Sequence, residues 1–492
     1  MADEDVHLAT DVLVIGAGGA GMSAALSAAA KGADVMLVDR SLIGRGGATI
    51  MAQMTVAAAI GEEVPDRWEN HFADTIAAGR GLCDANLAAL VCREGPSAIR
   101  QMDEWKVGWA RASDGHIRQA HAPGHDRPRC VYVDFLSTGP AVAKTLRTRV
   151  MRQGKITRIG DLYIADLVIR DGEALGAVGF SVTDSRPVAI AAASVVLATG
   201  GLTRLYRRNS ASANMGGDGH ALALRAGAEL MDMEFVQFFP IGHLAPRLVG
   251  MDPIMWDPFR YKLGGRLLNS ENREFMNDYG NEESDKYVVA RDHATYAILK
   301  EVEAGRGSPA GGAYLSFEHV PAEKLREAFG PVIDRLARNG IDLNKMPIEV
   351  SPIAHYHMGG VRVDGSLATR IPNFFAAGEL VAGANGANRL SGNAITEALV
   401  FGRKAGEEAA ARAMASKGRS PPGFGREGLD LVRSGGGRTA ERCAGMIAEL
   451  QGVMVDLVGP FRTRQGLERA LARIGAMKTA MGALPPDRHG AF

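Results

Sequence analysis

The chain has few cysteines and no long apolar run. Its cysteines, Cys83, Cys92, Cys130 and Cys443, are scattered over 492 residues and form no CxxC pair. This spacing argues against an iron–sulfur cluster or a zinc site within the chain and indicates reduced thiols. No apolar run reaches the ~18 residues of a membrane span, and the acidic N-terminus lacks the apolar segment of a signal peptide. We therefore expect a cytoplasmic protein without a bound metal or a membrane span.

An excess of charge of one sign is also missing. Lys+Arg and Asp+Glu each number 56, so the formal net charge is zero, and no basic tract is visible. This balance argues against a nucleic-acid partner. Glycine, in contrast, is abundant: 61 residues exceed the usual share of about 7%, which indicates many close backbone approaches of the kind that nucleotide-binding folds need. The length predicts two or three domains.

A nucleotide-binding pattern occupies the N-terminal region. Residues 11–15 (DVLVI) have the pattern of a buried parallel strand, GAGGAG follows at 16–21, and residues 22–31 are helical in character. A second strand at 34–38 ends at Asp39. A GxGxxG between strand and helix, with an acid about twenty residues on, predicts dinucleotide binding. An acid that binds ribose hydroxyls favours FAD or NAD over NADP.

Further segments also fit a dinucleotide-binding fold. The loop at 41–54 is rich in small residues, and we expect it to lie flat against a planar ligand. The strand at 193–197 ends in ATGG at 198–201, where small residues let the chain pass beside a cofactor. Residues 62–115 are expected to be helical, and the segments within 131–182 to form a small antiparallel excursion.

The stretch from 351 to 402 combines a histidine pair, a Gly-Gly turn, a strand pattern that ends in Gly378-Glu379, and Arg389. Residues 391–393 (SGN) then begin an apolar helix. A helix start aims unpaired N–H groups and a partial positive charge at whatever precedes it. An electron-rich cofactor that becomes anionic on reduction would suit that place.

Motifs along nearly the whole chain carry a family resemblance. They are GAGGAG at 16–21, ATGG at 198–201, GGDGHALALRAGAELMDMEFVQFFP at 216–240, GGRLLN at 264–269, RDHATYAIL at 291–299, AHYHMGG at 354–360, NFFAAGE at 373–379, GANRLSGNAITEALVFGRKAG at 386–406 and ELQGVMVDLVGPFRTRQGLERAL at 449–471. With them the chain resembles the flavoprotein subunits of the succinate dehydrogenase/fumarate reductase family, whose relatives include L-aspartate oxidase and the adenylylsulfate reductase flavoprotein.

The resemblance implies an α/β fold in which a Rossmann-like FAD-binding domain carries an inserted α+β capping domain and a helical C-terminal region. We expect the FAD-binding domain at 1–228 and 345–412, the capping domain at 229–344, and the C-terminal helical region at 413–492. The motifs and the resemblance together predict a set of FAD-binding residues. They are Gly16, Gly18, Gly19, Ala20, Gly21, Asp39, Arg40, Ser41, Gly46, Gly47, Ala48, Gln53, Met54, Ala198, Thr199, Gly200, Gly201, Asn214, Asp218, Glu379, Arg389, Gly392, Asn393, Ala394 and Ile395.

The resemblance also assigns chemistry. It implies hydride transfer at flavin N5 coupled to proton transfer at the neighbouring substrate carbon, with Arg291 as the proton shuttle. His355 and Arg389 match the histidine and arginine that bind a substrate carboxylate, and a guanidinium fork suits a carboxylate well. Covalent attachment of FAD is not expected, because the family's covalent members use a histidine after the second strand. This chain has no histidine between His7 and His71.

The chain departs from the family at one of the positions that bind a substrate carboxylate. Succinate and fumarate members read QFHPTG where this chain reads QFFPIG, so Phe239 replaces a carboxylate-binding histidine. This change disfavours a C4 dicarboxylate and favours a substrate with one carboxylate, a thioester, an apolar group or a different oxyanion. His243 and Arg260 are candidates for compensation, and His357 is a candidate substrate contact that also suits a purely structural histidine.

We therefore predict an FAD-dependent oxidoreductase that acts on a carbon–carbon bond next to a carboxylate or thioester. Electrons would pass to or from a separate iron–sulfur protein, because this chain carries no cluster motif. Alternatives are an amino-acid oxidase of the L-aspartate oxidase type, sulfur chemistry of the adenylylsulfate reductase type, and a non-catalytic flavoprotein subunit that relays electrons.

Overall fold

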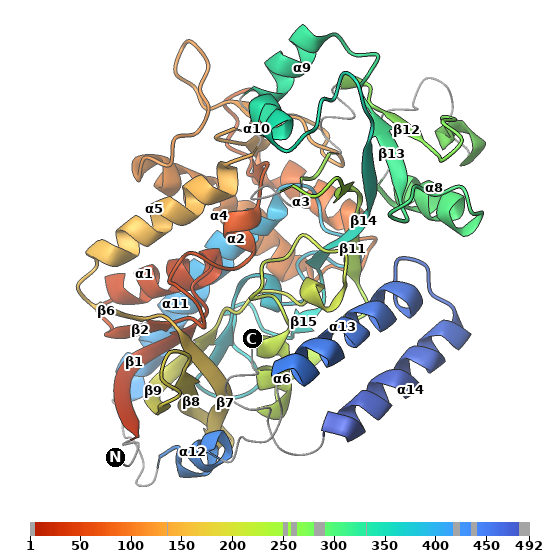
Figure 1. Cartoon of the computed structure of the whole chain (residues 1–492). Coiled ribbons are helices and arrows are strands. Elements are labelled where there is room, and N and C mark those ends of the chain that lie inside the picture. The colour runs from red at the N-terminus through yellow and green to blue at the C-terminus, as the bar shows by residue number, and fades with distance from the viewer. Residues whose placement is uncertain are drawn as a thin grey trace.

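The computed structural model describes residues 5–134, 136–248, 254–256, 263–279, 291–330, 332–416, 424–433 and 440–481. Within these ranges the chain forms a large α/β domain, a smaller domain above it, and a C-terminal helical hairpin (Figure 1). This architecture confirms the expected fold class.

The large domain is built on a seven-stranded sheet. Its strand order is β6-β2-β1-β9-β8-β7, and β16 pairs with β9. The strands are β1 (Val6–Ile15), β2 (Val35–Val38), β6 (Ile156–Ile159), β7 (Leu162–Arg170), β8 (Glu173–Ser181), β9 (Pro187–Leu197) and β16 (Phe374–Ala376). Strands β6, β2, β1, β9 and β16 run parallel, and β7, β8 and β9 are joined antiparallel. The predicted strands at 11–15 and 34–38 are confirmed.

The expected antiparallel excursion is only partly right. β7 and β8 form an antiparallel hairpin, but β6 pairs parallel with β2 at the edge of the main sheet. Its parallel direction follows from helix α5 (Thr138–Arg152), which provides the crossover that parallel strands require. Residues 130–131 form β5 (Cys130–Val131) in a separate three-stranded sheet with β3 (Val56–Ala57) and β4 (Gln119–Ala120).

Two helices of small residues cross closely over the main sheet. They are α1 (Gly19–Ala30) and α11 (Asn393–Ser416). A Cβ atom on Gly402 of α11 would lie 2.2 Å from the carbonyl oxygen of Ala20, and one on Gly406 would lie 2.2 Å from that of Ala24. Because neither glycine has a side chain, α11 can approach α1 closely, and both helix starts reach the same edge of the sheet. The expected helices at 62–115 are α3 (Trp68–Ala78) and α4 (Ala85–Glu104).

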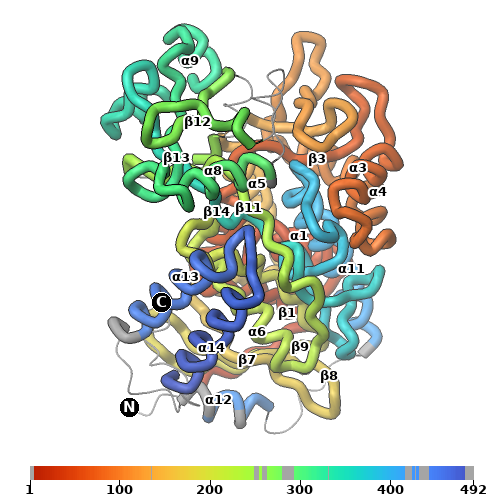
Figure 2. The backbone as a smooth tube through the Cα atoms, turned by 90° about the vertical axis from the view of Figure 1, so that its right-hand side faces the viewer, coloured from red at the N-terminus to blue at the C-terminus, as the bar shows by residue number. Residues whose placement is uncertain are grey.

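The capping domain has its own sheet and its own core. Strands β11 (Val236–Ala245), β14 (Ile348–His357), β13 (Ala313–Ser316) and β12 (Arg266–Leu268) pair antiparallel in that order. Helices α8 (Arg291–Glu303), α9 (Ala322–Phe329) and α10 (Val332–Arg338) pack with them. Figure 2 shows this domain standing beside the upper part of the large domain. Ile348 and Val350 belong to the core of the smaller domain, so this core extends past residue 344, where the capping domain was expected to end.

The C-terminal region contains α12 (Arg426–Arg433), α13 (Ala440–Leu457) and α14 (Arg464–Met481). Leu429 of α12 packs against the main sheet. The hairpin of α13 and α14 is tied to the large domain where the Tyr206 hydroxyl donates to the Val458 carbonyl at 3.1 Å. None of the helices in the described part of the chain is long and apolar enough to cross a membrane.

Candidate active site

One pocket joins the two domains. It comprises about 1350 Å³ of space not filled by protein atoms, part of it open to solvent, and it runs from the glycine loop after β1 to residues of the capping sheet. Eighteen of the predicted FAD-binding residues line it. They are Gly16, Gly18, Gly19, Ala20, Asp39, Gly47, Ala48, Gln53, Met54, Ala198, Thr199, Gly200, Asn214, Glu379, Arg389, Gly392, Ala394 and Ile395.

The glycine loop has the geometry of a nucleotide cradle. Gly16 has a φ of +103°, and a Cβ atom there would lie 2.4 Å from the Ala198 carbonyl oxygen. A Cβ atom on Gly21 would lie 1.7 Å from the Gly16 carbonyl oxygen, so Gly21 packs inside the turn. Gly18, in contrast, has no atom within 4 Å of a Cβ position and leaves an open face for a ligand. This arrangement fits a pyrophosphate at the start of α1.

Asp39 is oriented by the loops on both sides of it. Its Oδ2 accepts the Ala17 N–H at 2.7 Å, and its Oδ1 accepts the N–H and hydroxyl of Ser41, each at 2.8 Å. The Asn214 side chain donates to the Ser41 hydroxyl at 2.8 Å. The carboxylate therefore lies fixed at the pocket wall, as ribose binding requires.

Other predicted cofactor residues lie next to the pocket, and Arg40 and Asp218 line an adjoining cavity together with Asp39 and Asn214. Arg40 and Asp218 form an ion pair at 2.9 Å. A Cβ atom on Gly46 would lie 2.3 Å from the Asn214 amide nitrogen, and one on Gly201 would lie 2.2 Å from Glu379 Oε1. At each glycine a side chain would collide with a residue that lines the pocket.

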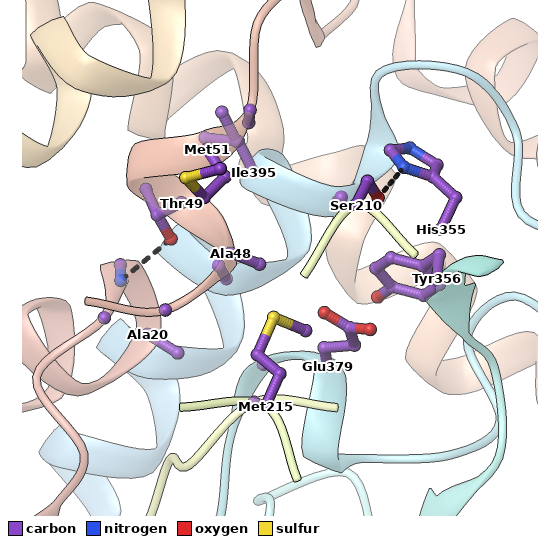
Figure 3. Close-up of a pocket in the computed structure, with 18 of the residues that line it drawn as sticks. Ala20, Ala48, Thr49, Met51, Ser210, Met215, His355, Tyr356, Glu379 and Ile395 are labelled. Carbon is purple, nitrogen blue, oxygen red and sulfur yellow. Dashed lines mark hydrogen bonds between the residues drawn. The ribbon is translucent and has the colours of Figure 1, made fainter. Parts of the chain in front are cut away.

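Glu379 lies on the short 3-10 helix η4 (Gly378–Leu380) and points into the middle of the pocket, as Figure 3 shows. Its Oε1 accepts the His357 N–H at 3.1 Å. Burial raises the pKa of Glu379 to about 8. A carboxyl group that holds its proton near neutral pH can both donate to and accept from sugar hydroxyls. Glu379 thus fits the ribose or ribityl part of a flavin.

The capping end of the pocket combines apolar side chains with an arginine and a histidine. Phe239 and Met255 form an apolar wall, where they pack with Ile353. Arg389 and His355 line the same end, and the His355 ring contacts the Phe239 ring edge to face, with 5.5 Å between the ring centres. The Met255 N–H donates to the Gln53 side-chain oxygen at 3.4 Å, so the apolar wall contacts the loop at 41–54 of the large domain.

Arg389 and His355 are each oriented by a partner. His355 Nδ1 lies 2.8 Å from the Ser210 hydroxyl, the contact drawn in Figure 3. The Arg389 guanidinium donates to the Gln237 side-chain oxygen at 2.9 Å and stacks on the Tyr356 ring, with 4.5 Å from its carbon to the ring centre. This end of the pocket can hold an anion beside an apolar group.

Four other predicted site residues lie elsewhere or at the edge of the described chain. His357 does not line the pocket: it is fully buried, its Nε2 contacts the Met233 carbonyl, and burial lowers its pKa. His243 has both ring nitrogens engaged, by the Pro246 carbonyl and the Trp256 indole N–H. The structure therefore does not support a substrate contact by either histidine. Arg260 lies outside the described residues, and Arg291 is the first residue of α8.

Sequence reasoning missed Tyr356, Ser210 and Met255 as pocket residues. Strand alternation would place His355 and His357 on one face and Tyr356 on the other. Gln237 pairs with Tyr356, however, and Phe238 pairs with Ala354, so His355 is an extra residue in the ladder. Such a β-bulge re-aims the side chains around it. The order of the motif AHYHMGG does not reveal this bulge.

Comparisons with known proteins settle the family. Residues 11–395 match the FAD binding domain family. The chain belongs to this family. It is 37% identical over 491 residues to a protein of Methanothermobacter marburgensis named as one subunit of fumarate reductase (CoM/CoB), covering 98% of this chain and 87% of that protein. Mycobacterium smegmatis Sdh1, solved in complex with UQ1, is 34% identical with a TM-score of 0.88, over 99% of this chain and 83% of its own.

A more distant structure shows the fold alone. Adenylylsulfate reductase from Archaeoglobus fulgidus is 20% identical with a TM-score of 0.73, over 99% of this chain and 86% of its own. The chain is thus an FAD-dependent oxidoreductase of the fumarate reductase/succinate dehydrogenase flavoprotein family, and its cofactor is FAD. The open glycine loop, the fixed Asp39 and the protonated Glu379 fit that cofactor.

Proposed function

We propose that this protein transfers a hydride between FAD and a carbon next to a carboxylate or thioester group. The observation that carries the proposal is a single pocket. The glycine loop at Gly16 lines one part of it, and His355 and Arg389, which we propose to bind an anion, line another part. Bound FAD supplies the redox chemistry through its isoalloxazine ring, while the protein supplies orientation and electrostatics.

In this proposal the chain's own residues divide the work. Arg389 and His355 bind the substrate carboxylate, since a guanidinium fork and an imidazole N–H both donate to an anion. The Ser210 hydroxyl holds the His355 ring in one orientation. Arg291, at the start of α8, moves the proton at the neighbouring substrate carbon. Phe239 and Met255 exclude water and contact the rest of the substrate.

The apolar wall is the reason for proposing a substrate other than a C4 dicarboxylate. A second carboxylate lying against Phe239 and Met255 would lose its hydration and gain no hydrogen-bond donor from either side chain, and that loss is costly. A substrate with one carboxylate or a thioester, and an apolar group elsewhere, fits these side chains together with Arg389 and His355. Fumarate is the competing candidate, because relatives 31% to 37% identical to this chain are named as subunits of fumarate reductases.

We further propose that the chain exchanges electrons with a separate iron–sulfur protein. The relatives are named as subunits, which supports a multi-subunit assembly. Among the described residues, no group of three or more histidines, cysteines or acids could hold a metal ion. The four cysteines are free thiols.

The decisive experiment is an anaerobic screen of the purified holoenzyme against carboxylates and acyl thioesters, with flavin absorbance as the readout. We expect bleaching by a saturated monocarboxylate or thioester, or reoxidation of reduced FAD by the unsaturated counterpart. Turnover of fumarate or succinate alone would contradict the substrate proposal. Oxygen consumption with amino acids would favour the oxidase alternative. AMP-dependent flavin bleaching by sulfite would favour the sulfur alternative.

A further inference from the structure

The turn that precedes α11 is held from behind by two buried histidines. His125 Nε2 lies 2.7 Å from the carbonyl oxygen of Ser391. His71 Nε2 lies 2.8 Å from the side-chain oxygen of Asn393, the first residue of α11. Between them Gly392 has a φ of +83°. Neither histidine lines the pocket, whereas Ser391 and Gly392 do.

The same turn is fixed by a backbone bond. The Ala57 N–H donates to the Gly392 carbonyl at 3.0 Å, and the Thr396 hydroxyl donates to the Ala57 carbonyl at 2.6 Å. The carbonyl oxygens of Ser391 and Gly392 are therefore bound to donors behind the pocket. The unpaired N–H groups that begin a helix carry partial positive charge, and here this helix start lies at the pocket wall, where Ala394 and Ile395 line the cavity.

The hydrogen bonds of His125 define its tautomer. Its Nδ1 lies 3.0 Å from Arg129 Nη1, and a guanidinium can only donate, so Nδ1 accepts and Nε2 carries the proton. Burial lowers the pKa of His125 to about 4, and the charge of Arg129 acts in the same direction. Arg129 is fully buried and is fixed by three carboxylates. They are Asp66 at 2.8 Å, Asp74 at 2.5 Å and Asp126 at 2.8 Å.

A neutral histidine with a fixed tautomer donates a hydrogen bond from one ring nitrogen and accepts one at the other. Because Arg129 cannot move without breaking three ion pairs, the His125 ring is held, and its Nε2–H donates to the Ser391 carbonyl at 2.7 Å, much closer than the Cys130 sulfur at 3.6 Å. His71 is also neutral, since burial lowers its pKa to about 3. Asn393 Oδ1 can only accept, so His71 Nε2 donates to it.

We propose that His125 and His71 are positioning residues that keep the N–H groups at the start of α11 aimed at the flavin ring and thereby raise its reduction potential. The inference rests on the proposed function in one respect, that FAD binds in this pocket with its isoalloxazine ring against the start of α11. A two-electron-reduced flavin carries negative charge on its pyrimidine side, so N–H dipoles aimed there stabilise the reduced form more than the oxidised form. Neither histidine touches the cofactor in this proposal.

The test compares His125→Leu, His125→Asn and His125→Gln in the FAD-loaded protein. Gln can accept from Arg129 through its oxygen and donate to Ser391 through its amide, whereas the shorter Asn cannot span both and Leu offers neither. We expect the equilibrium constant for flavin reduction against a reference dye to fall about tenfold in the Leu and Asn variants. For a two-electron couple that fall equals about 30 mV. The Gln variant should keep the parent value.

His319→Leu is the matched control, because His319 is an exposed histidine of the capping domain, and its equilibrium constant should not change. An unchanged constant in His125→Asn that retains FAD would overturn the inference, as would an equal fall in His125→Gln. Sulfite affinity gives a second readout that needs no substrate, and it should fall in parallel. Because neither measurement involves turnover, a negative substrate screen would sink the proposed function and leave this inference standing.

Discussion

The guanidinium of Arg389 rests on the ring of Tyr356, with 4.5 Å between the guanidinium carbon and the ring centre. The Tyr356 hydroxyl in turn donates to Glu397 Oε2 at 2.8 Å, and the Asn385 amide donates to the same oxygen at 2.6 Å. Glu397 is fully buried on α11. Arg389, which we propose to bind the substrate, therefore stacks on a tyrosine ring whose hydroxyl is held by a hydrogen bond to Glu397.

The first prediction concerns this support. Tyr356→Leu removes the ring beneath Arg389, whereas Tyr356→Phe keeps the ring and removes only the hydroxyl. A cation–π contact contributes about 0.5–2 kcal/mol, so we expect KM for an anionic substrate to rise roughly two- to thirtyfold in Tyr356→Leu. In Tyr356→Phe the rise should be smaller. Steady-state kinetics measure both, and equal effects in the two variants would show that the ring does not position Arg389.

Arg291 should be required for turnover but not for binding. In Arg291→Gln we expect kcat to fall by about 100-fold or more, the range of general acid–base contributions. Binding of a carboxylate inhibitor, followed by its effect on the flavin spectrum, should be almost unchanged. A variant that keeps full turnover would remove the proton-shuttle role. Arg335→Gln, on α10 of the capping domain, is the control.

Phe239 should determine which anions the pocket accepts. Phe239→His adds a donor at the apolar wall, and a hydrogen bond to a charged group contributes about 1.5–3 kcal/mol. We expect the affinity for a C4 dicarboxylate to increase at least tenfold, measured by titration of the flavin absorbance. Phe239→Leu removes the ring without adding a donor and should show no such gain. An equal gain in affinity in both variants would show that the larger pocket, and not a new hydrogen bond, improves dicarboxylate binding.

The FAD should dissociate from the denatured protein. The residues between Gly47 and Thr55 that line the pocket include no histidine, and the chain has none between His7 and His71. After acid precipitation we expect the yellow colour in the supernatant, measured by absorbance near the flavin band. A coloured pellet that survives washing in denaturant would demonstrate covalent attachment through another residue.

Two buried acids, Glu379 and Glu397, should each stabilise the FAD-free protein less as pH rises from about 4.5 to 8. Burial raises the pKa of Glu379 to about 8 and that of Glu397 to about 7, well above the ordinary value near 4.3. Between these limits the two carboxyls bind more protons in the folded state than in the unfolded state, so their contribution to the free energy of unfolding decreases with pH. Below about pH 6.5 the buried neutral His71 and His125 act in the opposite direction. Thermal unfolding of Glu379→Gln and Glu397→Gln should therefore show a smaller loss, or a larger gain, of stability with rising pH than the parent. The exposed Glu323→Gln should retain the parent slope.

Local motifs predicted the nucleotide half of the site. The GxGxxG at 16–21 and Asp39 follow from requirements that are short in sequence: a turn, a close approach and an acid at a strand end. The role of Glu379 rests on the motif NFFAAGE of the family resemblance. Arg389 and His355 came from the family resemblance, and both line the pocket. The chemical roles of these residues stay predictions until the substrate is known.

The rest of the site depends on contacts that sequence patterns do not record. Tyr356 lines the pocket because of a β-bulge at His355, and a bulge depends on the pairing strand β11. His125 meets Ser391 although 266 residues separate them. The parallel pairing of β6 with β2 arises from the α5 crossover, whereas the local pattern suggested an antiparallel hairpin. Long-range geometry decided each of these cases.

Strand β14 begins in the capping core at Ile348 and reaches the flavin pocket at His355. The backbone at Ala354 is hydrogen-bonded to Arg208 and Ser210 of the large domain, so a rotation of the upper domain about the lower one would have to be absorbed within this strand. His355 would then keep its place beside Ser210 while the pocket opens to admit a substrate.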